Sequence, residues 1–484
     1  MSHARPPKDA GDAPQAVSGG RVRRVAPLVG LTARAVGEAA AIALRGKLAG
    51  ESATEFHVRT AERYAELFGR SKGALMKAGQ MFSFVLLRFA VPIELQSIYQ
   101  TAFERLCAEA PPMAPELARD VLEGELGRPA EDAFVEFDWR PFAAASIGQV
   151  HAARLHDGRA VAVKIQYPGV AEAIRADLKN VELLATFLTL AIGAIFPRGQ
   201  RLGLRSAAHE IAARVEEELD YRLEARSQSE FADHFRGHPF IHVPDVVGEL
   251  STDRVLTQEL VRGMSWDEAL VADQDLRDQW AEAIHRFLYG SMYRLQRLNA
   301  DPQPGNFIFH EDGSLSCLDF GSIKRFQWEH AEMLRAIFRA CLRNDVLGTY
   351  RASVEAGMWR SSDPVTPEEA FAYWSGDNAL FWAQERFVAT PGYVARGLGR
   401  RYSPAGPSAN ALRHLTMPPE LALMVRIEIG LTSLIGRLRA GNDWGSFAAE
   451  YCEDAVPTTA LGKRERAFFE QRWQSVMPER DVTR

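Results

Sequence analysis

Hydrophobic and polar residues follow two different periods along the chain. Apolar residues recur at helical spacing over 55–90, 116–127, 171–196, 203–235, 279–298 and most of 329–484. Short apolar runs bounded by turn residues predict strands that start at Phe134 and follow at 242–247, 254–261, 307–309 and 315–318. The sequence His156-Asp157-Gly158 predicts a hairpin turn. We therefore expect an α+β fold.

Composition and charge narrow the class of protein. The apolar fraction of 46% and the charged fraction of 25% are typical of a globular protein. A net charge of −6 without a stripe of Lys or Arg argues against a nucleic-acid partner. Without CxxC or other ligand-like spacing, the cysteines indicate neither a disulfide framework nor a zinc site, and they fit a reducing cytosol. The four are Cys107, Cys317, Cys341 and Cys452.

Three segments bear on membranes. Residues 1–20 lack the apolar core of a cleavable signal peptide, so we expect a cytoplasmic protein. The apolar run Val181 to Phe196 has 16 residues and contains Glu182, short of the ~20 that cross a bilayer, and predicts a buried or interfacial helix. The basic helical stretch Arg21 to Gly50 could lie peripherally on the inner face of a membrane or pack on its own protein.

The segment between Leu298 and Gly321 contains the main candidates for catalytic and metal-binding residues. Asp301, Asn306 and Asp319 stand at separations of five and thirteen, and Asp319 opens an Asp-Phe-Gly triplet. Those are the separations of a kinase catalytic loop and the metal-binding loop that follows it. Asp301 would accept a proton from the attacking oxygen, whereas Asn306 and Asp319 supply the hard oxygen ligands that Mg²⁺ prefers. The sequence therefore predicts phosphoryl transfer with ATP and Mg²⁺.

A phosphate loop and a lysine precede this stretch in the expected order. Residues 143–150 read AxAxxGxV, against GxGxxGxV in kinases, with alanine in place of two glycines. Lys164 ends a Val-Ala-Val-Lys strand that matches the strand whose lysine holds the α- and β-phosphates. Because alanine resists positive φ, we expect this loop to be stiffer than the glycine-rich loop of a protein kinase. The expected nucleotide contacts in this segment are Ala143, Ala144, Ala145, Ser146, Gly148, Val150 and Lys164.

Acidic residues downstream are candidates for the partner of Lys164. Glu224 is a candidate ion-pair partner from a neighbouring helix. Glu218 and Asp220 diverge by about 200° on a regular helix, so both can serve one site only if the helix ends or bends there. A solvated acidic face is the alternative. After these residues, backbone groups from Glu259 to Val261 could bind adenine.

Together these motifs resemble the AarF/UbiB family of atypical, protein-kinase-like proteins, which are linked to ubiquinone and other isoprenoid-lipid pathways. The matching marks also include a KxGQ motif at Lys77 to Gln80 and an ExD motif at Glu218 and Asp220. The resemblance implies a two-lobed protein-kinase-like fold in which Lys77 and Gln80 point into the cleft. It also implies that Lys164 pairs with Glu224, and that Glu218 and Asp220 face the nucleotide.

The resemblance also predicts how the chain is divided. We expect a disordered tail and basic helix (1–50), a helical extension with the KxGQ motif (51–130), a kinase-like N-lobe with inserted helices (131–262), a C-lobe core (263–345) and a C-terminal helical region (346–484). Asn299 and Gln303 stand where the family usually has histidine, which predicts a weaker loop geometry and a lower turnover. No Ala-Pro-Glu motif follows Gly321, so docking of a protein substrate in the usual manner is not expected.

The predicted function is an ATPase or a lipid or small-molecule kinase that supports isoprenoid-lipid metabolism. An isoprenoid lipid or quinone precursor is then the expected partner besides the nucleotide, and the sequence contains no signal for an oligomeric state. Two alternatives stay open. One is a pseudokinase scaffold for a lipid-biosynthesis complex, and the other is a small-molecule kinase of the aminoglycoside or choline type.

Overall fold

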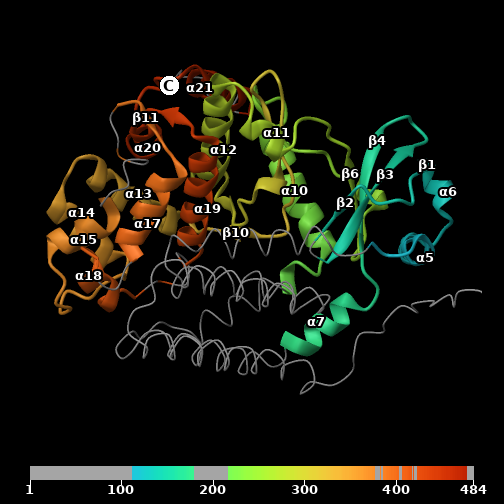
Figure 1. Ribbon diagram of the computed structural model, residues 1–484, viewed down its shortest axis with the longest axis horizontal. Coiled ribbons are helices and arrows are strands. Elements are labelled where there is room, and N and C mark those ends of the chain that lie inside the picture. Colours follow the sequence, from blue (N-terminus) through green and yellow to red (C-terminus); the bar gives the residue numbers. More distant parts are fainter. Residues whose placement is uncertain are drawn as a thin grey trace, which may run out of the picture.

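The computed structural model describes residues 112–145, 147–178, 216–375, 382, 385–402, 406–416, 418 and 422–476. Figure 1 shows a sheet at one end of the molecule, a group of helices at the other, and the helices α10 and α12 between them. This arrangement confirms the predicted mixed fold of helix and sheet with a helical C-terminal region.

The first lobe is built on an antiparallel sheet of five strands. The order is β1-β3-β4-β6, and β2 pairs with β3. Gly158 adopts a φ of 91° at the turn between β3 and β4, where the hairpin was predicted. The strands are β1 (Phe134–Phe137), β2 (Ala143–Ala144), β3 (Gly148–Leu155), β4 (Ala160–Gln166) and β6 (Val255–Glu259).

The residues of β4 alternate between the two faces of this sheet. Val161, Val163 and Ile165 are buried in one core with helices α5 (Pro115–Leu126) and α6 (Ala130–Ala133). Lys164 therefore lies on the opposite face, where α7 (Val170–Leu178) and α10 (Tyr221–Phe235) pack.

Short elements lie between α10 and β6. They are β5 (Ile241–His242) and the 3₁₀ turn η1 (Gly248–Leu250). The strand predicted over 242–247 is shorter than expected, because Pro244 has no N–H to donate to a ladder. Beyond it, Val246 forms only an isolated bridge with Gln258.

Helix α12 (Gln274–Leu295) is the centre of the second lobe, and its residues from Trp280 to Tyr293 are buried. Around it lie small antiparallel pairs, β7 with β10 and β8 with β9, and β5 pairs in parallel with β9. The bounds are α11 (Trp266–Leu270), β7 (Arg297–Asn299), η2 (Pro304–Asn306), β8 (Phe307–Phe309), β9 (Leu315–Cys317) and β10 (Ile323–Arg325).

The C-terminal helices share one hydrophobic core with α12 and α10. The helical pattern predicted over most of 329–484 includes α19, which buries Ile427, Leu431 and Ile435. The elements are α13 (Trp328–Leu342), α14 (Val346–Glu355), α15 (Pro367–Ser375), β11 (Phe387–Val388), α17 (Pro391–Tyr402), α18 (Ala409–His414), α19 (Ala422–Leu438), β12 (Gly441–Asn442), α20 (Trp444–Glu453) and α21 (Ala460–Val476).

Two helices differ from their predicted extent. The helix predicted over 203–235 is interrupted, because the chain turns at 218–220 and α10 begins only at Tyr221. The helix predicted over 279–298 ends at Leu295, since Gln296 adopts a left-handed conformation with a φ of 57°. The next three residues form strand β7 instead.

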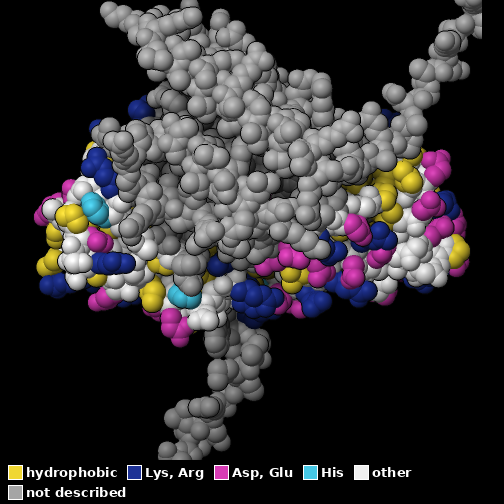
Figure 2. Space-filling model, turned by 90° about the horizontal axis from the view of Figure 1, so that it is seen from below, with side chains coloured by type: hydrophobic (Ala, Val, Ile, Leu, Met, Phe, Trp, Pro, Cys, Tyr) yellow, Lys and Arg dark blue, Asp and Glu magenta, His cyan; other side chains and the backbone are white. Residues whose placement is uncertain are grey.

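No helix within the described ranges is both long and apolar enough to cross a membrane. The basic stretch Arg21 to Gly50 and the apolar run Val181 to Phe196 both lie outside the described residues. On the described surface visible in Figure 2, acidic and basic side chains are interspersed.

Candidate functional site

Three charged side chains from distant parts of the sequence meet at the junction of the two lobes. The ammonium nitrogen Nζ of Lys164, on β4, lies 2.9 Å from both carboxylate oxygens of Glu224, on α10. The same nitrogen lies 3.8 Å from Oδ2 of Asp319, in the loop after β9. The Glu224 side chain is only 4% exposed, whereas that of Asp319 is 39% exposed. The site is therefore closed on the side of α10 and open on the side of Asp319.

Local structure explains why these three side chains converge. Asp220 caps α10, because its carboxylate accepts hydrogen bonds from the backbone N–H groups of Arg222 and Leu223. Glu224 then falls in the first turn of the helix. Asp319 has a φ of 59°, which non-glycine residues rarely adopt, and its Oδ1 accepts a hydrogen bond from the N–H of Gly321.

Burial and charge act against each other at Lys164. Burial on its own would lower the pKa of Lys164, but the carboxylates of Glu224 and Asp319 raise it well above its ordinary value. Burial raises the pKa of the Glu224 carboxyl to about 7, against the opposing effect of the Lys164 ammonium. The lysine is therefore held as a cation at the opening beside Asp319, where an anion could approach it.

Tyr221 belongs to this group although the sequence did not single it out. Its ring lies under Lys164, with 4.8 Å from Nζ to the ring centroid, and the residue is 1% exposed. Its hydroxyl is buried and has no hydrogen-bond partner within the described part of the chain. An aromatic residue directly after the helix-capping Asp220 was the available signal, since it enters the helix one turn before Glu224.

The predicted catalytic loop brings its residues to the same edge of the lobe. Asp301 is 7% exposed, and its backbone carbonyl accepts a hydrogen bond of 2.9 Å from Nδ2 of Asn306. The backbone carbonyl of Asn306 in turn accepts from the N–H of Leu318, at 2.8 Å. Asp301, Asn306 and the start of the Asp319 loop are thus linked by hydrogen bonds.

Asn299 and Gln303, which replace the family's usual histidines, both contact this loop. Asn299 accepts a hydrogen bond from the N–H of Asp301 and donates one to the carbonyl oxygen of Asp319, at 3.0 and 2.9 Å. Gln303 donates from Nε2 to the carboxylate of Asp301. Asn299 therefore joins the two loops, and Gln303 occupies one oxygen of Asp301.

The Ala-rich loop forms a tight hairpin. Ala143 and Ala144 pair with Val150 and Gln149, and the N–H of Ala145 donates to the carbonyl of Gly148 at 2.9 Å. Val150 lies directly opposite Lys164 in the ladder, so the two side chains share a face.

Gly148 is required by the packing of the sheet. A Cβ at this position would lie 2.2 Å from the backbone oxygen of Ile165. This close approach between β3 and β4 accounts for the glycine without any ligand.

The remaining predicted contacts are less clearly directed at the site. The turn at 218–220 provides the bend that Glu218 and Asp220 need, but the Asp220 carboxylate is used as the cap of α10. Glu218 is close enough to raise the pKa of Glu224, after burial and Asp319. Glu259 ends β6, and its N–H donates to the carbonyl of Asp245. Val261 follows in the segment that joins the lobes.

Three predicted site residues, Lys77, Gln80 and Ser146, lie outside the described residues. Within the described ranges, no group of three or more His, Cys, Asp or Glu side chains gathers as a metal site. Asn306 and Asp319 offer one amide and one carboxylate. This smaller set of hard oxygen donors fits Mg²⁺, which commonly takes its other ligands from phosphate and water.

The first lobe contains an antiparallel sheet and the Lys164–Glu224 pair, and the second, mostly helical lobe carries Asp301, Asn306 and Asp319. This is the arrangement of a protein-kinase-like fold. The ABC1 atypical kinase-like domain matches residues 105–353, more than half of the 484 residues. The chain therefore belongs to this family, which confirms the AarF/UbiB resemblance.

Relatives of known name agree with this assignment. The mitochondrial atypical kinase COQ8B of Rattus norvegicus is 35% identical over 304 residues, which are 62% of this chain and 55% of the relative. The mitochondrial atypical kinase COQ8 of Saccharomyces cerevisiae is 30% identical over 310 residues, which are 64% of this chain and 60% of the relative. The chain thus spans little more than half the length of these two relatives.

A solved structure shares the fold. It is the complex of Rv3197 with erythromycin from Mycobacterium tuberculosis, with a TM-score of 0.59 and 28% identity. The similarity covers 83% of this chain and 97% of that one. The likeness therefore extends well beyond residues 105–353.

Proposed function

We propose that this protein binds ATP with Mg²⁺ between its lobes and either hydrolyses the nucleotide or transfers its γ-phosphate to a lipid or small molecule. Family membership supports a role in ubiquinone or other isoprenoid-lipid metabolism. The observation that carries the proposal is the position of the Lys164 ammonium between a buried carboxylate, Glu224, and an exposed one, Asp319.

In this proposal each group has a role that its surroundings suit. Lys164, oriented by Glu224, would hold the α- and β-phosphates, and Asp301 would accept the proton of the attacking hydroxyl or water. Asn306 and Asp319 would hold the metal ion. When bound, the nucleotide supplies the phosphoryl group, and its Mg²⁺ ion neutralises charge on the phosphate oxygens. By family likeness, Lys77 and Gln80 would point into the cleft and restrict access to it.

ATP binding and turnover of the full chain test the proposal. Asp319→Asn keeps the size of the side chain but removes its charge, so we expect turnover to fall by about 100-fold or more. Asp312→Asn is the matched control, because Asp312 lies in the exposed turn between β8 and β9, where its carboxylate accepts hydrogen bonds from Ser314. Turnover that is unchanged in Asp319→Asn would remove the enzymatic proposal.

One observation favours a second candidate, a nucleotide-binding scaffold without turnover. Gln303 donates a hydrogen bond to the carboxylate that would act as the base, Asp301, and so competes with a substrate hydroxyl for that oxygen. Tight ATP binding by the native chain without release of phosphate would support the scaffold. Turnover that rises in Gln303→Ala would show that the glutamine restrains an active enzyme.

A further inference from the structure

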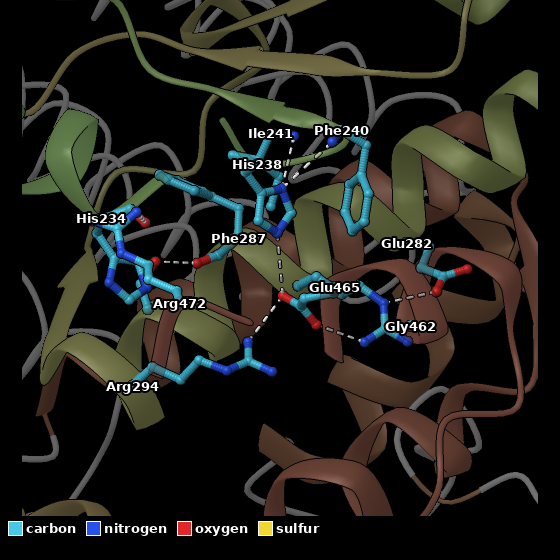
Figure 3. Close-up of polar contacts among 12 residues, drawn as sticks. His234, His238, Phe240, Ile241, Glu282, Phe287, Arg294, Gly462, Glu465 and Arg472 are labelled. Carbon is cyan, nitrogen blue, oxygen red and sulfur yellow. Dashed lines mark hydrogen bonds and ion pairs between the residues drawn. The ribbon is translucent and has the colours of Figure 1, made fainter. Parts of the chain in front are cut away.

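The carboxyl end of α10 is held by the last described helix of the chain, α21. The guanidinium of Arg472 donates to the backbone carbonyls of Asp233, His234 and Arg236, the last two at 3.1 and 3.5 Å. Figure 3 shows Arg472 beside His234. Carbonyls at a helix end have no partner within the helix, and a cation there also interacts favourably with the helix dipole. Arg472 therefore serves α10 as a C-terminal cap supplied from far along the chain.

Aromatic contacts extend this attachment. The rings of Phe469 and Phe468 lie 5.0 Å from those of His234 and His238, respectively. Arg464 donates to the carbonyl of Pro239 at 2.7 Å. Helix α21 thus holds both the end of α10 and the connection that leads to β5.

Helix α21 is in turn fixed to the second lobe. Glu465 is 1% exposed, and its carboxylate accepts hydrogen bonds of 2.9 Å from Arg286 and from Arg294, both on α12. Figure 3 shows Arg294 directed at Glu465. Breaking a buried charge pair leaves an uncompensated charge, so this attachment strongly favours one position of α21. The position of the carboxyl end of α10 relative to α12 is therefore fixed through α21.

The other end of α10 carries Glu224. A helix of 15 residues is about 22 Å long and behaves as a rigid element, so its tilt moves both ends together. Along its length, Phe231 packs against Phe287 of α12 and against Phe320, next to Asp319, at 5.7 and 5.0 Å between rings. A change where Arg472 binds would therefore be transmitted to Glu224.

We propose that Arg472 is a positioning residue for the Lys164–Glu224 pair: by capping α10 from α21, it sets the position of Glu224. Its effect on catalysis rests on the function proposed above. Its effect on α10 does not, and the two can be measured separately.

Hydrogen exchange of the full chain tests the effect on α10. In Arg472→Ala, we expect the amides of residues 225–228 to exchange about 5- to 30-fold faster, the upper part of the range that a cation at a helix end contributes. Arg466→Ala is the matched control, because Arg466 lies on the same helix but bonds to Glu470 and to the carbonyl of Ala455. Arg472→Lys keeps the charge and should give an intermediate value. Faster exchange in α21 alone, with 225–228 unchanged, would overturn the proposal.

A double-mutant cycle tests whether the effect passes through Glu224. We expect Arg472→Ala to lower kcat/KM for ATP about 5- to 30-fold in the native background and to have less than a twofold effect when Glu224 is already Gln. Equal losses in both backgrounds would mean that Arg472 does not act through Glu224. If the native chain neither binds nor turns over ATP, the proposed function fails, and the exchange experiment still decides the role of Arg472.

Discussion

The side-chain amide of Asn299 donates a hydrogen bond of 2.9 Å to the backbone carbonyl of Asp319. The carbonyl oxygen Oδ1 of the same side chain accepts a hydrogen bond from the N–H of Asp301. Asn299 is 4% exposed, so water cannot readily replace either bond. One buried amide therefore sets the spacing between the loop of the proposed base and the loop of the proposed metal ligand.

We expect Asn299→Ala to lower turnover by about 10- to 100-fold, because the two loops lose their common support. The Mg²⁺ concentration for half-maximal activity should rise in the same variant. The measurement is a titration of ATP turnover with Mg²⁺. Asn410→Ala, at a distant surface asparagine that bonds to Pro364 and Glu369, is the control. Unchanged kinetics in Asn299→Ala would contradict the role of this amide.

Tyr221 carries a buried hydroxyl without a hydrogen-bond partner among the described residues. Removing such a group avoids its desolvation cost, so Tyr221→Phe should stabilise the protein by about 1 kcal/mol. The ring that lies under Lys164 is kept. Urea unfolding measures the change, and a lower stability would show that the hydroxyl has a partner outside those residues.

Ala145 begins the tight turn of the predicted phosphate loop, and its N–H is bonded to the carbonyl of Gly148. Glycine at this position gives the backbone conformations that alanine resists, at a cost of roughly 1 kcal/mol in loop order. We therefore expect Ala145→Gly to change the ratio of ATP to ADP affinity several-fold. Calorimetric titration with both nucleotides tests this, and identical affinities would make the alanine incidental to binding.

Gly148 approaches the backbone of Ile165 too closely for a side chain. Gly148→Ala must separate β3 from β4 beside Lys164, so we expect a loss of about 3 kcal/mol in the free energy of unfolding. Gly248→Ala is the control, since a Cβ there meets nothing within 4 Å. Equal stability of the two variants in urea unfolding would contradict the packing argument.

His238 makes stability depend on pH. Burial, followed by the charge of Arg294, lowers the pKa of His238 to about 2, whereas the unfolded chain titrates near 6.5. Below pH 6.5 the unfolded state therefore binds a proton that the folded state does not, and stability falls as the pH falls. Between pH 6 and 4 this histidine should contribute a slope of about 1.4 kcal/mol per pH unit.

His238→Gln should remove that part of the slope. The difference between variant and native chain isolates His238 from Glu224 and Glu282, whose raised pKa values act in the opposite direction over this range. The measurement is urea unfolding at several pH values, with His156→Gln at an exposed position as the control. Parallel pH profiles for native and His238→Gln chains would refute the assignment.

Much of the site was predictable because it depends on local periodicity and on residue chemistry. The alternation along β4 places Lys164 opposite the buried Val163 and Ile165, whatever packs on that face. The turn residues between β8 and β9 determine that pairing in the same way. The division of the chain into domains, and the roles of the individual site residues, stay predictions.

Other features could not be predicted because they depend on contacts between distant segments. Four glutamates lie between residues 216 and 224. Only the start of α10, which Asp220 caps, determines that Glu224 is the one that points at Lys164. The pattern of α21 indicates a helix, but nothing in it names the end of α10 as the surface that Arg472 contacts.

The sequence by itself determined the types and the order of the reactive groups, because kinase-like chemistry requires particular side chains at particular spacings. Only the tertiary structure decided which carboxylate meets Lys164, which amide joins the two loops, and which helix holds α10. Those choices depend on packing energies between segments 20 to 238 residues apart, and a local pattern does not encode them.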